Sequence, residues 1–171
     1  MGTYIIAILC IGMGIVFDQY TKYLAVTNLK DAPFPIIDGI FELRYLENRG
    51  AAFGMLQNQQ WFFLVIGFLL LIVITILYIR LPHTKRLLPL RICMIFITCG
   101  AIGNMIDRIR LNYVIDFLYF ELIDFPIFNV ADIYVSVATF VLVILLLFYY
   151  KDEELDEFFR VFSLKKNTEQ E

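Results

Sequence analysis

The sequence has 171 residues, of which 60% are hydrophobic, 16% aromatic and 18% charged, and its net charge at pH 7 is −3. Soluble domains contain roughly 45–50% apolar and about 25% charged residues, so this composition excludes an ordinary soluble domain and indicates a membrane protein. The mildly acidic charge also argues against a nucleic-acid partner, because such partners are bound by basic surfaces.

Four segments are long and apolar enough to cross a bilayer, because about 20 helical residues cover its hydrocarbon core. We expect these spans at about residues 3–26, 61–79, 87–106 and 130–150. The first is not expected to be a removable signal peptide, since it lacks a basic leading region and a small-x-small cleavage site. The sequence therefore predicts a single integral membrane domain over residues 1–171, an all-α polytopic protein with four transmembrane helices.

The two longer connections between spans are expected to form a small cap with β structure. In the stretch IIDGIFELRY, residues 36–45, Asp38 and Gly39 separate an apolar pair from a run that alternates apolar and charged residues. An Asp-Gly pair in this setting favours a two-stranded hairpin. Residues 107–130 are apolar, but acidic residues and a proline interrupt them too often for a fifth span. The cap would thus combine 27–60 with 107–130.

The distribution of Lys and Arg predicts the orientation. The loop over 80–91 and the tail over 151–171 together hold eight Lys and Arg in 33 residues, whereas 27–60 and 107–130 hold five in 58. Short connections rich in Lys and Arg stay on the cytoplasmic side of the membrane. We therefore expect both termini and the tail in the cytoplasm, and the cap outside.

Two short motifs, GAIGNMIDR (100–108) and FNVAD (128–132), each contain Asn-x-x-Asp. With the termini inside, Asp107 ends the third span and Asp132 begins the fourth, so both carboxylates would lie at the outer boundary. The spacing puts each Asn on the same helical face as its Asp, where the amide can orient the carboxylate or bind a substrate carbonyl. Two aspartates that share a proton can activate water and protonate a leaving amine.

A purely structural interpretation exists for one of the two motifs. Asn129 is a good N-cap, with Asp132 as an acidic residue in the first helical turn. Asp107 has no such explanation, because a carboxylate at a helix C-terminus meets the negative end of the dipole. Asp18 and Lys22 stand one turn apart in the first span and either pair only with each other or also brace the outer pocket.

The same dipole argument predicts how the shared proton is distributed. We expect Asp132 to be the base, because free N–H groups at a helix start favour its ionised form. Asp107 would hold the proton at rest, unless the guanidinium of Arg108 turns toward it.

Other chemistries are excluded by the residue inventory. His83 is the only histidine and falls in the cytoplasmic loop, while the only serines, Ser136 and Ser163, lie on the inner side of Asp132. Ser/His and Cys/His nucleophilic sites and a zinc site therefore lack residues at the outer pocket, and we expect no metal and no cofactor. Three cysteines inside the spans are expected to be small buried hydrophobes: Cys10, Cys93 and Cys99.

Five blocks of the sequence carry a family resemblance. These are DQYTK (18–22), ENRGAAFG (47–54), GAIGNMIDR (100–108), VIDF (114–117) and FNVAD (128–132). In this order they resemble the blocks of the bacterial lipoprotein signal peptidases, also called signal peptidase II. The resemblance extends from residue 3 to about residue 150, and the joint occurrence of the blocks is highly specific. One departure is Cys99, where the family more often has glycine.

The resemblance implies an aspartic endopeptidase (EC 3.4.23.36) of the bacterial cytoplasmic membrane that needs no metal. It would remove signal peptides from prolipoproteins, cutting just before a cysteine that carries diacylglycerol, and peptide-like inhibitors of the family would bind it. Matching the motifs makes Asp107 and Asp132 the catalytic pair. The same matching implies that nine further residues support the site or contact substrate: Asp18, Lys22, Asn48, Gly54, Asn104, Arg108, Asp116, Asn129 and Ala131.

A small proton-coupled membrane transporter is the main alternative, since polar residues inside spans are also typical of transporters. A non-catalytic membrane adaptor is a third possibility. Against both, the polar residues gather on the outer side and the inner halves of the spans offer no polar path. Neither class explains a doubled Asn-x-x-Asp at matching depth.

Overall fold

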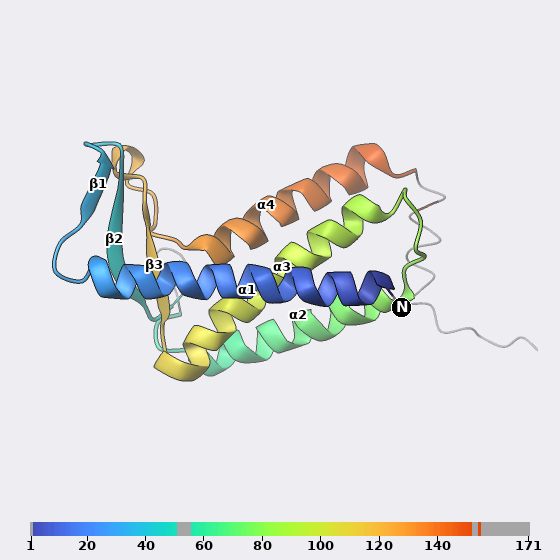
Figure 1. The fold of residues 1–171 in the computed structure, drawn as a ribbon, viewed down its shortest axis with the longest axis horizontal. Coiled ribbons are helices and arrows are strands. Elements are labelled where there is room, and N and C mark those ends of the chain that lie inside the picture. Colours follow the sequence, from blue (N-terminus) through green and yellow to red (C-terminus); the bar gives the residue numbers. More distant parts are fainter. Residues whose placement is uncertain (1, 51–55, 152–153, 155–171) are drawn as a thin grey trace, which may run out of the picture.

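Four long helices form a bundle, and a small sheet stands across one end of it (Figure 1). The computed structural model describes residues 2–50, 56–151 and 154. The helices are α1 (Gly2–Asn28), α2 (Gln60–Arg80), α3 (Leu88–Leu111) and α4 (Val130–Ile144), and the last continues into a π-helical turn, η3 (Leu145–Tyr149). We call the end that carries the sheet the sheet end, and the opposite end, where α1 begins, the far end (Figure 1).

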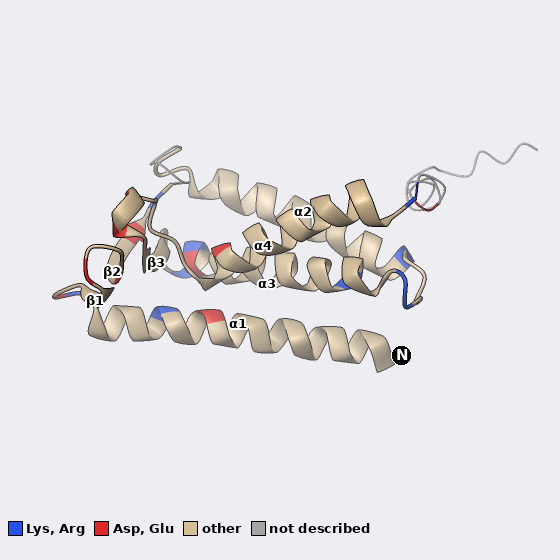
Figure 2. Cartoon of the chain, turned by 90° about the horizontal axis from the view of Figure 1, so that it is seen from above, with Lys and Arg blue, Asp and Glu red and all other residues tan. Residues whose placement is uncertain are grey.

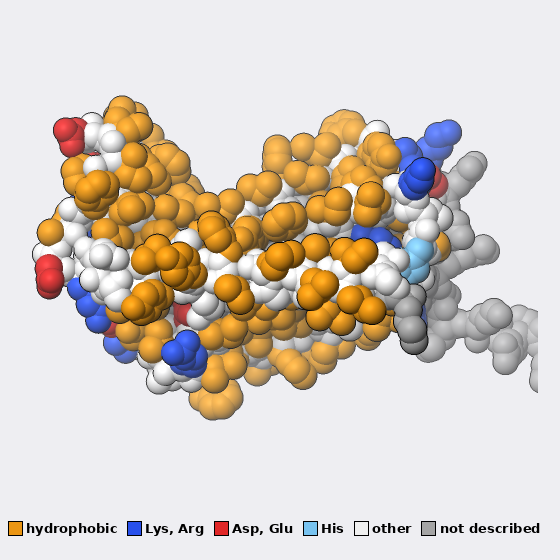
Figure 3. All heavy atoms as spheres, in the orientation of Figure 1, with side chains coloured by type: hydrophobic (Ala, Val, Ile, Leu, Met, Phe, Trp, Pro, Cys, Tyr) orange, Lys and Arg blue, Asp and Glu red, His pale blue; other side chains and the backbone are white. Residues whose placement is uncertain are grey.

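The four helical segments have the length and apolar composition of membrane spans. Their outward faces carry large exposed apolar side chains, such as Ile8 at 68% and Phe140 at 67% exposure. Figure 3 shows apolar side chains covering the middle of the molecule, with charged side chains toward its two ends. Water would solvate such a surface poorly, whereas lipid tails solvate it well. The predicted four-helix membrane fold is therefore confirmed.

The sheet is antiparallel with the strand order β1-β2-β3. Its strands are β1 (Phe34–Ile37), β2 (Phe41–Asn48) and β3 (Val114–Tyr119), and a short 3₁₀ turn, η2 (Glu121–Ile123), follows β3. The predicted hairpin is confirmed between β1 and β2, where Gly39 adopts a positive φ of 70° that favours glycine. Strand β3 was not expected from the sequence, because its first four residues are all buried and show no alternation of apolar and polar side chains.

Helix α3 is the centre of the bundle, in contact with the three other helices. Two glycines on α3 allow close approach at the sheet end. A Cβ atom on Gly100 would collide with the backbone carbonyl of Ala131 in the first turn of α4. A Cβ atom on Gly103 would lie 2.5 Å from the carboxylate of Asp18, which reaches in from α1. These glycines therefore bring α1, α3 and α4 together where polar residues gather.

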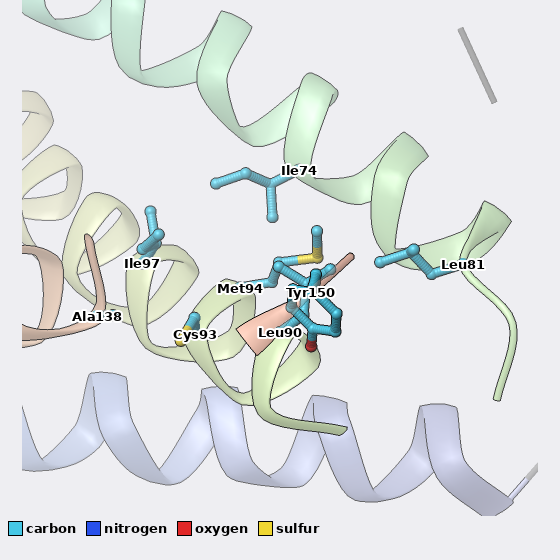
Figure 4. Packing of buried hydrophobic residues seen from close by; sticks show 8 residues of the cluster. All are labelled: Ile74, Leu81, Leu90, Cys93, Met94, Ile97, Ala138 and Tyr150. Carbon is cyan, nitrogen blue, oxygen red and sulfur yellow. The ribbon is translucent and has the colours of Figure 1, made fainter. Parts of the chain in front are cut away.

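The two ends of the bundle have different cores. At the far end, a cluster of apolar side chains joins α2, α3 and the end of α4 (Figure 4): Ile74, Leu81, Leu90, Cys93, Met94, Ile97, Ala138 and Tyr150. At the sheet end, Ala25 of α1 and Leu29, the residue directly after α1, pack against Ile115 and Phe117 of β3. This second cluster fixes the sheet on the bundle.

Of the three cysteines, Cys93 and Cys99 are buried, Cys10 is half-buried, and all are unpaired thiols. Two segments with expected roles lie outside the described residues. One contains Gly54, and the other is the tail, of which only Lys151 and Glu154 are described.

Candidate active site

A cavity of about 820 Å³ lies between the sheet and the sheet-end parts of α3 and α4. This volume is in the range of sites that bind small molecules and short peptides. Its wall includes the polar residues Asn48, Asn104, Arg108, Asp116, Asp132 and Ser136. Among the described residues, the acidic positions on the four helices lie only in the halves next to the sheet (Figure 2).

Asp132 is held in the first turn of α4 by a capping box. The side chain of Asn129 accepts a hydrogen bond from the Asp132 backbone N–H at 3.0 Å, and the Asp132 carboxylate accepts one from the Asn129 N–H at 3.1 Å. The N-cap interpretation is thus confirmed. Capping is not the only contact of Asp132, because its other carboxylate oxygen faces Asn104 and accepts a hydrogen bond from Asn104 Nδ2 at 2.8 Å.

The amide of Asn104 can adopt only one orientation. Its oxygen accepts hydrogen bonds from Lys22 Nζ at 2.9 Å and from Asn129 Nδ2 at 3.2 Å. Since both neighbours are donors, the Asn104 nitrogen must face the carboxylate of Asp132. Asn104 therefore connects the charged residues of α1 to α4.

Asp116 on β3 occupies the same wall, and it is only 1% exposed. Its two oxygens accept hydrogen bonds from Asn129 Nδ2 at 2.6 Å and Asn48 Nδ2 at 2.8 Å. Burial and the nearby charge of Asp132 raise the pKa of Asp116 to about 7. A pKa near 7 lets Asp116 hold a proton near neutral pH, and the protonated form is the one that can act as a proton donor.

Behind the cavity wall lies a buried cluster of three charges. Lys22 Nζ is 3.0 Å from Asp18 Oδ2 and 2.8 Å from Asp107 Oδ2. The three residues are at most 2% exposed. Asp18 and Lys22 thus pair with each other, and the same ammonium also reaches the cavity wall by donating to Asn104.

Asp107 is a member of this cluster and not of the cavity wall. Besides the Lys22 ammonium, its carboxylate accepts hydrogen bonds from the Ile115 backbone N–H at 3.2 Å and from Gln19 Nε2 at 3.0 Å. The helix also runs past the expected end at 106 to Leu111, so Asp107 does not lie at its last carbonyls. Asp107 therefore lacks the helix-end position on which the expected resting proton depended, and that assignment stays a prediction.

The remaining expected residues surround these groups. Arg108 lines the cavity with its guanidinium 4.7 Å from the ring of Phe63, and its contact with the Asn104 carbonyl is long, at 3.5 Å. Ala131 is fully buried, and its N–H donates to Asp18 Oδ1 at 2.9 Å. Gly54 lies outside the described residues.

Two features of the site were not foreseen. Gln19 donates to Asp18, to Asp107 and to the Gly103 carbonyl at 3.0–3.3 Å, and its only signal in the sequence was its place inside DQYTK. Ser136 lies in the cavity wall. Its presence does not create a Ser/His site, because His83 contacts Tyr4 at the far end.

The chain is similar to known proteins over most of its length. Residues 10–148 match the family described as signal peptidase (SPase) II. The lipoprotein signal peptidase of Clostridioides difficile (strain 630) is 43% identical over 147 residues, which cover 85% of this chain and 94% of the relative. The lipoprotein signal peptidase of Caldanaerobacter subterraneus subsp. tengcongensis is 45% identical over 144 residues, which cover 83% and 96%.

Two solved structures, both bacterial membrane enzymes determined by the in meso method, have the same fold. The first, at 2.3 Å resolution, has a TM-score of 0.77 and 31% identity over 89% of this chain and 93% of that chain. The second, at 1.9 Å resolution, has a TM-score of 0.74 and 31% identity over 88% and 96%. With the family match over most of the chain and relatives above 40% identity, these findings show that the chain belongs to the signal peptidase II family of lipoprotein signal peptidases.

Proposed function

We propose that this membrane peptidase is an aspartic endopeptidase with Asp116 and Asp132 as its catalytic pair. It would cleave diacylglyceryl-modified prolipoproteins at the bond on the N-terminal side of the lipidated cysteine. The observation that carries this proposal is that the two carboxylates, one from β3 and one from α4, share one cavity wall, and Asn129 binds both residues.

The contacts favour Asp116 over Asp107 as the partner of Asp132. Both oxygens of Asp107 are occupied by donors behind the wall, among them the Lys22 ammonium. Asp116 contributes to the wall itself and interacts with the charge of Asp132. The sequence-based pairing of Asp107 with Asp132 therefore stays a prediction that the contacts do not favour, and we assign Asp107 a supporting role.

The two carboxylates have complementary roles in peptide hydrolysis. Ionised Asp132 takes a proton from water, whose oxygen attacks the scissile carbonyl carbon, while protonated Asp116 gives its proton to the carbonyl oxygen. The resulting gem-diol collapses as Asp116 takes back a hydroxyl proton and Asp132 donates its proton to the leaving nitrogen. The C–N bond breaks, and both carboxyls return to their starting states.

The position of the cavity suits a lipid-anchored substrate. A diacylglyceryl group is held in the bilayer by about 0.8 kcal/mol per buried CH₂, so the scissile bond stays near the membrane boundary. The cavity opens where the apolar helices meet the sheet, and it has Phe63 of α2 and Ser136 of α4 in its wall. The same cavity would accept peptide-like inhibitors, and membrane lipids would surround the apolar faces of the helices.

For the topology we propose a bacterial cytoplasmic membrane with both termini in the cytoplasm and the sheet end outside. The support is the excess of Lys and Arg in 80–91 and 151–171. The transporter alternative gains no support from the far end of the bundle, where apolar side chains fill the space between α2, α3 and α4 (Figure 4).

The direct test is a cleavage assay with purified protein in detergent, using a diacylglyceryl-modified precursor and its unlipidated form. We expect cleavage of the modified form only, and the same rate after treatment with EDTA. Asp116→Asn and Asp132→Asn should each lower the rate by roughly 10²- to 10⁴-fold. Asp107→Asn should keep measurable activity. If Asp116→Asn cleaves at the wild-type rate, the proposed pair is wrong.

A further inference from the structure

Two buried aspartates outside the cavity make equivalent contacts to the two catalytic segments. Asp107 Oδ2 accepts the backbone N–H of Ile115, the residue directly before Asp116. Asp18 Oδ1 accepts the backbone N–H of Ala131, the residue directly before Asp132. Each of these aspartates therefore holds the main chain next to one catalytic carboxylate.

Lys22 joins the two aspartates. Its ammonium lies 3.0 Å from Asp18 and 2.8 Å from Asp107, and it also donates to the Asn104 amide, which binds Asp132. The ammonium is thus the one group of this cluster that contacts both aspartates and the Asn104 amide. A shift of either aspartate changes the contacts of the other through this shared cation.

We propose that Asp18, Lys22 and Asp107 form a brace that sets the position of Asp116 relative to Asp132. The three are positioning residues, since they act on the catalytic carboxylates through Ile115, Ala131 and Asn104. This inference rests on the proposed function, because it takes Asp116 and Asp132 as the reacting pair.

The chemistry of the cluster supports a role beyond folding. Burying three charges costs several kcal/mol per ion, and apolar residues of similar size often stabilise a protein as well or better. Gly103 leaves the space through which the Asp18 carboxylate reaches α4. The brace spans α1, α3, β3 and α4, the elements that must keep their relative positions for two carboxylates to act on one bond.

The alternative is that the cluster only attaches α1 to the bundle. A matched pair of variants separates the two possibilities. Asp107→Asn keeps an oxygen that can accept from both Lys22 and Ile115, whereas Asp107→Leu has nearly the same size but no acceptor. Lys22→Met removes the shared cation with little change in length. Ile74→Ala, in the far-end cluster, serves as a control that lowers stability away from the site (Figure 4).

The experiment measures kcat and KM for the diacylglyceryl-modified precursor, together with the midpoint of thermal unfolding of each variant. For Asp107→Leu and Lys22→Met we expect kcat to fall by roughly 10²-fold, as for a small misplacement of reacting groups, with KM changed by less than about twofold. Asp107→Asn should lose less than about tenfold. Ile74→Ala should lower the unfolding midpoint and leave kcat near the wild-type value.

Lys22→Met leaves two buried carboxylates without their cation, which destabilises the fold. A variant with the wild-type net charge in this cluster is therefore needed to separate a loss of folding from a loss of catalysis. The double variant Lys22→Met/Asp107→Asn keeps the net charge of the three groups at −1, and it should show the same loss of kcat. If the brace variants behave like Ile74→Ala, with lower stability but normal kcat, the brace is refuted. If Asp107→Asn is as inactive as Asp132→Asn while Asp116→Asn cleaves, the catalytic assignment itself fails.

Discussion

The amide nitrogen of Asn129 lies 2.6 Å from a carboxylate oxygen of Asp116, although the two residues belong to different elements, the start of α4 and the strand β3. The oxygen of the same amide caps α4 by accepting the N–H of Asp132. One side chain therefore begins the helix of one proposed catalytic residue, Asp132, and orients the carboxylate of the other, Asp116.

These two roles of Asn129 can be separated by substitution. Asn129→Ser keeps an N-cap oxygen but loses the amide donor to Asp116, whereas Asn129→Ala loses both. We expect both variants to lose kcat to a similar extent, and only the alanine variant to lose a further ~1 kcal/mol of stability. Cleavage assays and thermal unfolding in detergent measure the two effects. If Asn129→Ser has the wild-type kcat, Asn129 only caps α4 and its amide donor to Asp116 does not contribute to the reaction.

The proton on Asp116 predicts how the rate depends on pH. Burial and the charge of Asp132 raise the pKa of Asp116 to about 7. The amide donors Asn48 and Asn129 and the Lys22 ammonium act in the opposite direction, and the guanidinium of Arg108 also interacts with this carboxyl. Because the protonated form is the acid, kcat/KM should fall as pH rises through about 7, tending to tenfold per pH unit. The control variant Asp38→Asn, in the β1–β2 turn, should show the same fall of kcat/KM with rising pH as the wild type. A rate independent of pH between 6 and 9 would contradict the assignment.

The same raised pKa predicts how stability depends on pH. A carboxyl with a higher pKa in the folded than in the unfolded state binds more protons when folded, so the free energy of unfolding falls as pH rises between the two values, about 4 and about 7. Asp116→Asn removes this titration. The unfolding midpoint of the variant, relative to that of the wild type, should therefore rise as the pH increases to about 7, and the difference should be constant above that pH. A constant difference across this range would show that Asp116 titrates normally.

The proposed topology can be tested by labelling single cysteines in sealed vesicles of known orientation. Cysteine replaces Asp38 in the β1–β2 turn or His83 in the loop between α2 and α3, in a background without the three native thiols. A membrane-impermeant maleimide should label position 38 from outside, and position 83 only after permeabilisation. The reverse pattern would place the cavity on the cytoplasmic side.

Local patterns in the sequence predicted much of this fold. Runs of about 20 apolar residues predicted four helices, Asp38-Gly39 predicted the hairpin, and Asn129 with Asp132 predicted the cap of α4. Each of these features depends on residues close together in the chain. The strand β3 could not be found in this way, because it is covered by α1 and carries no alternating pattern.

The distribution of roles within the site depends on contacts between distant segments. The proton was expected on Asp107 because of its own helix, with Arg108, its neighbour in the chain, as the opposing influence. The ammonium that decides its environment comes from Lys22 on α1, and the N–H of Ile115 comes from β3. No spacing rule connects these segments, so the motifs pointed to residues that gather at the sheet end without showing which aspartates face the cavity.

The missing side chain at Gly100 has a consequence for which sequences this fold tolerates. A single added methyl group there would meet the carbonyl of Ala131 and displace the turn of α4 that carries Asp132. At Gly12, on the open face of α1, a Cβ atom would meet nothing within 4 Å. In a library of random variants selected for lipoprotein processing, alanine should therefore be depleted at position 100 and common at position 12.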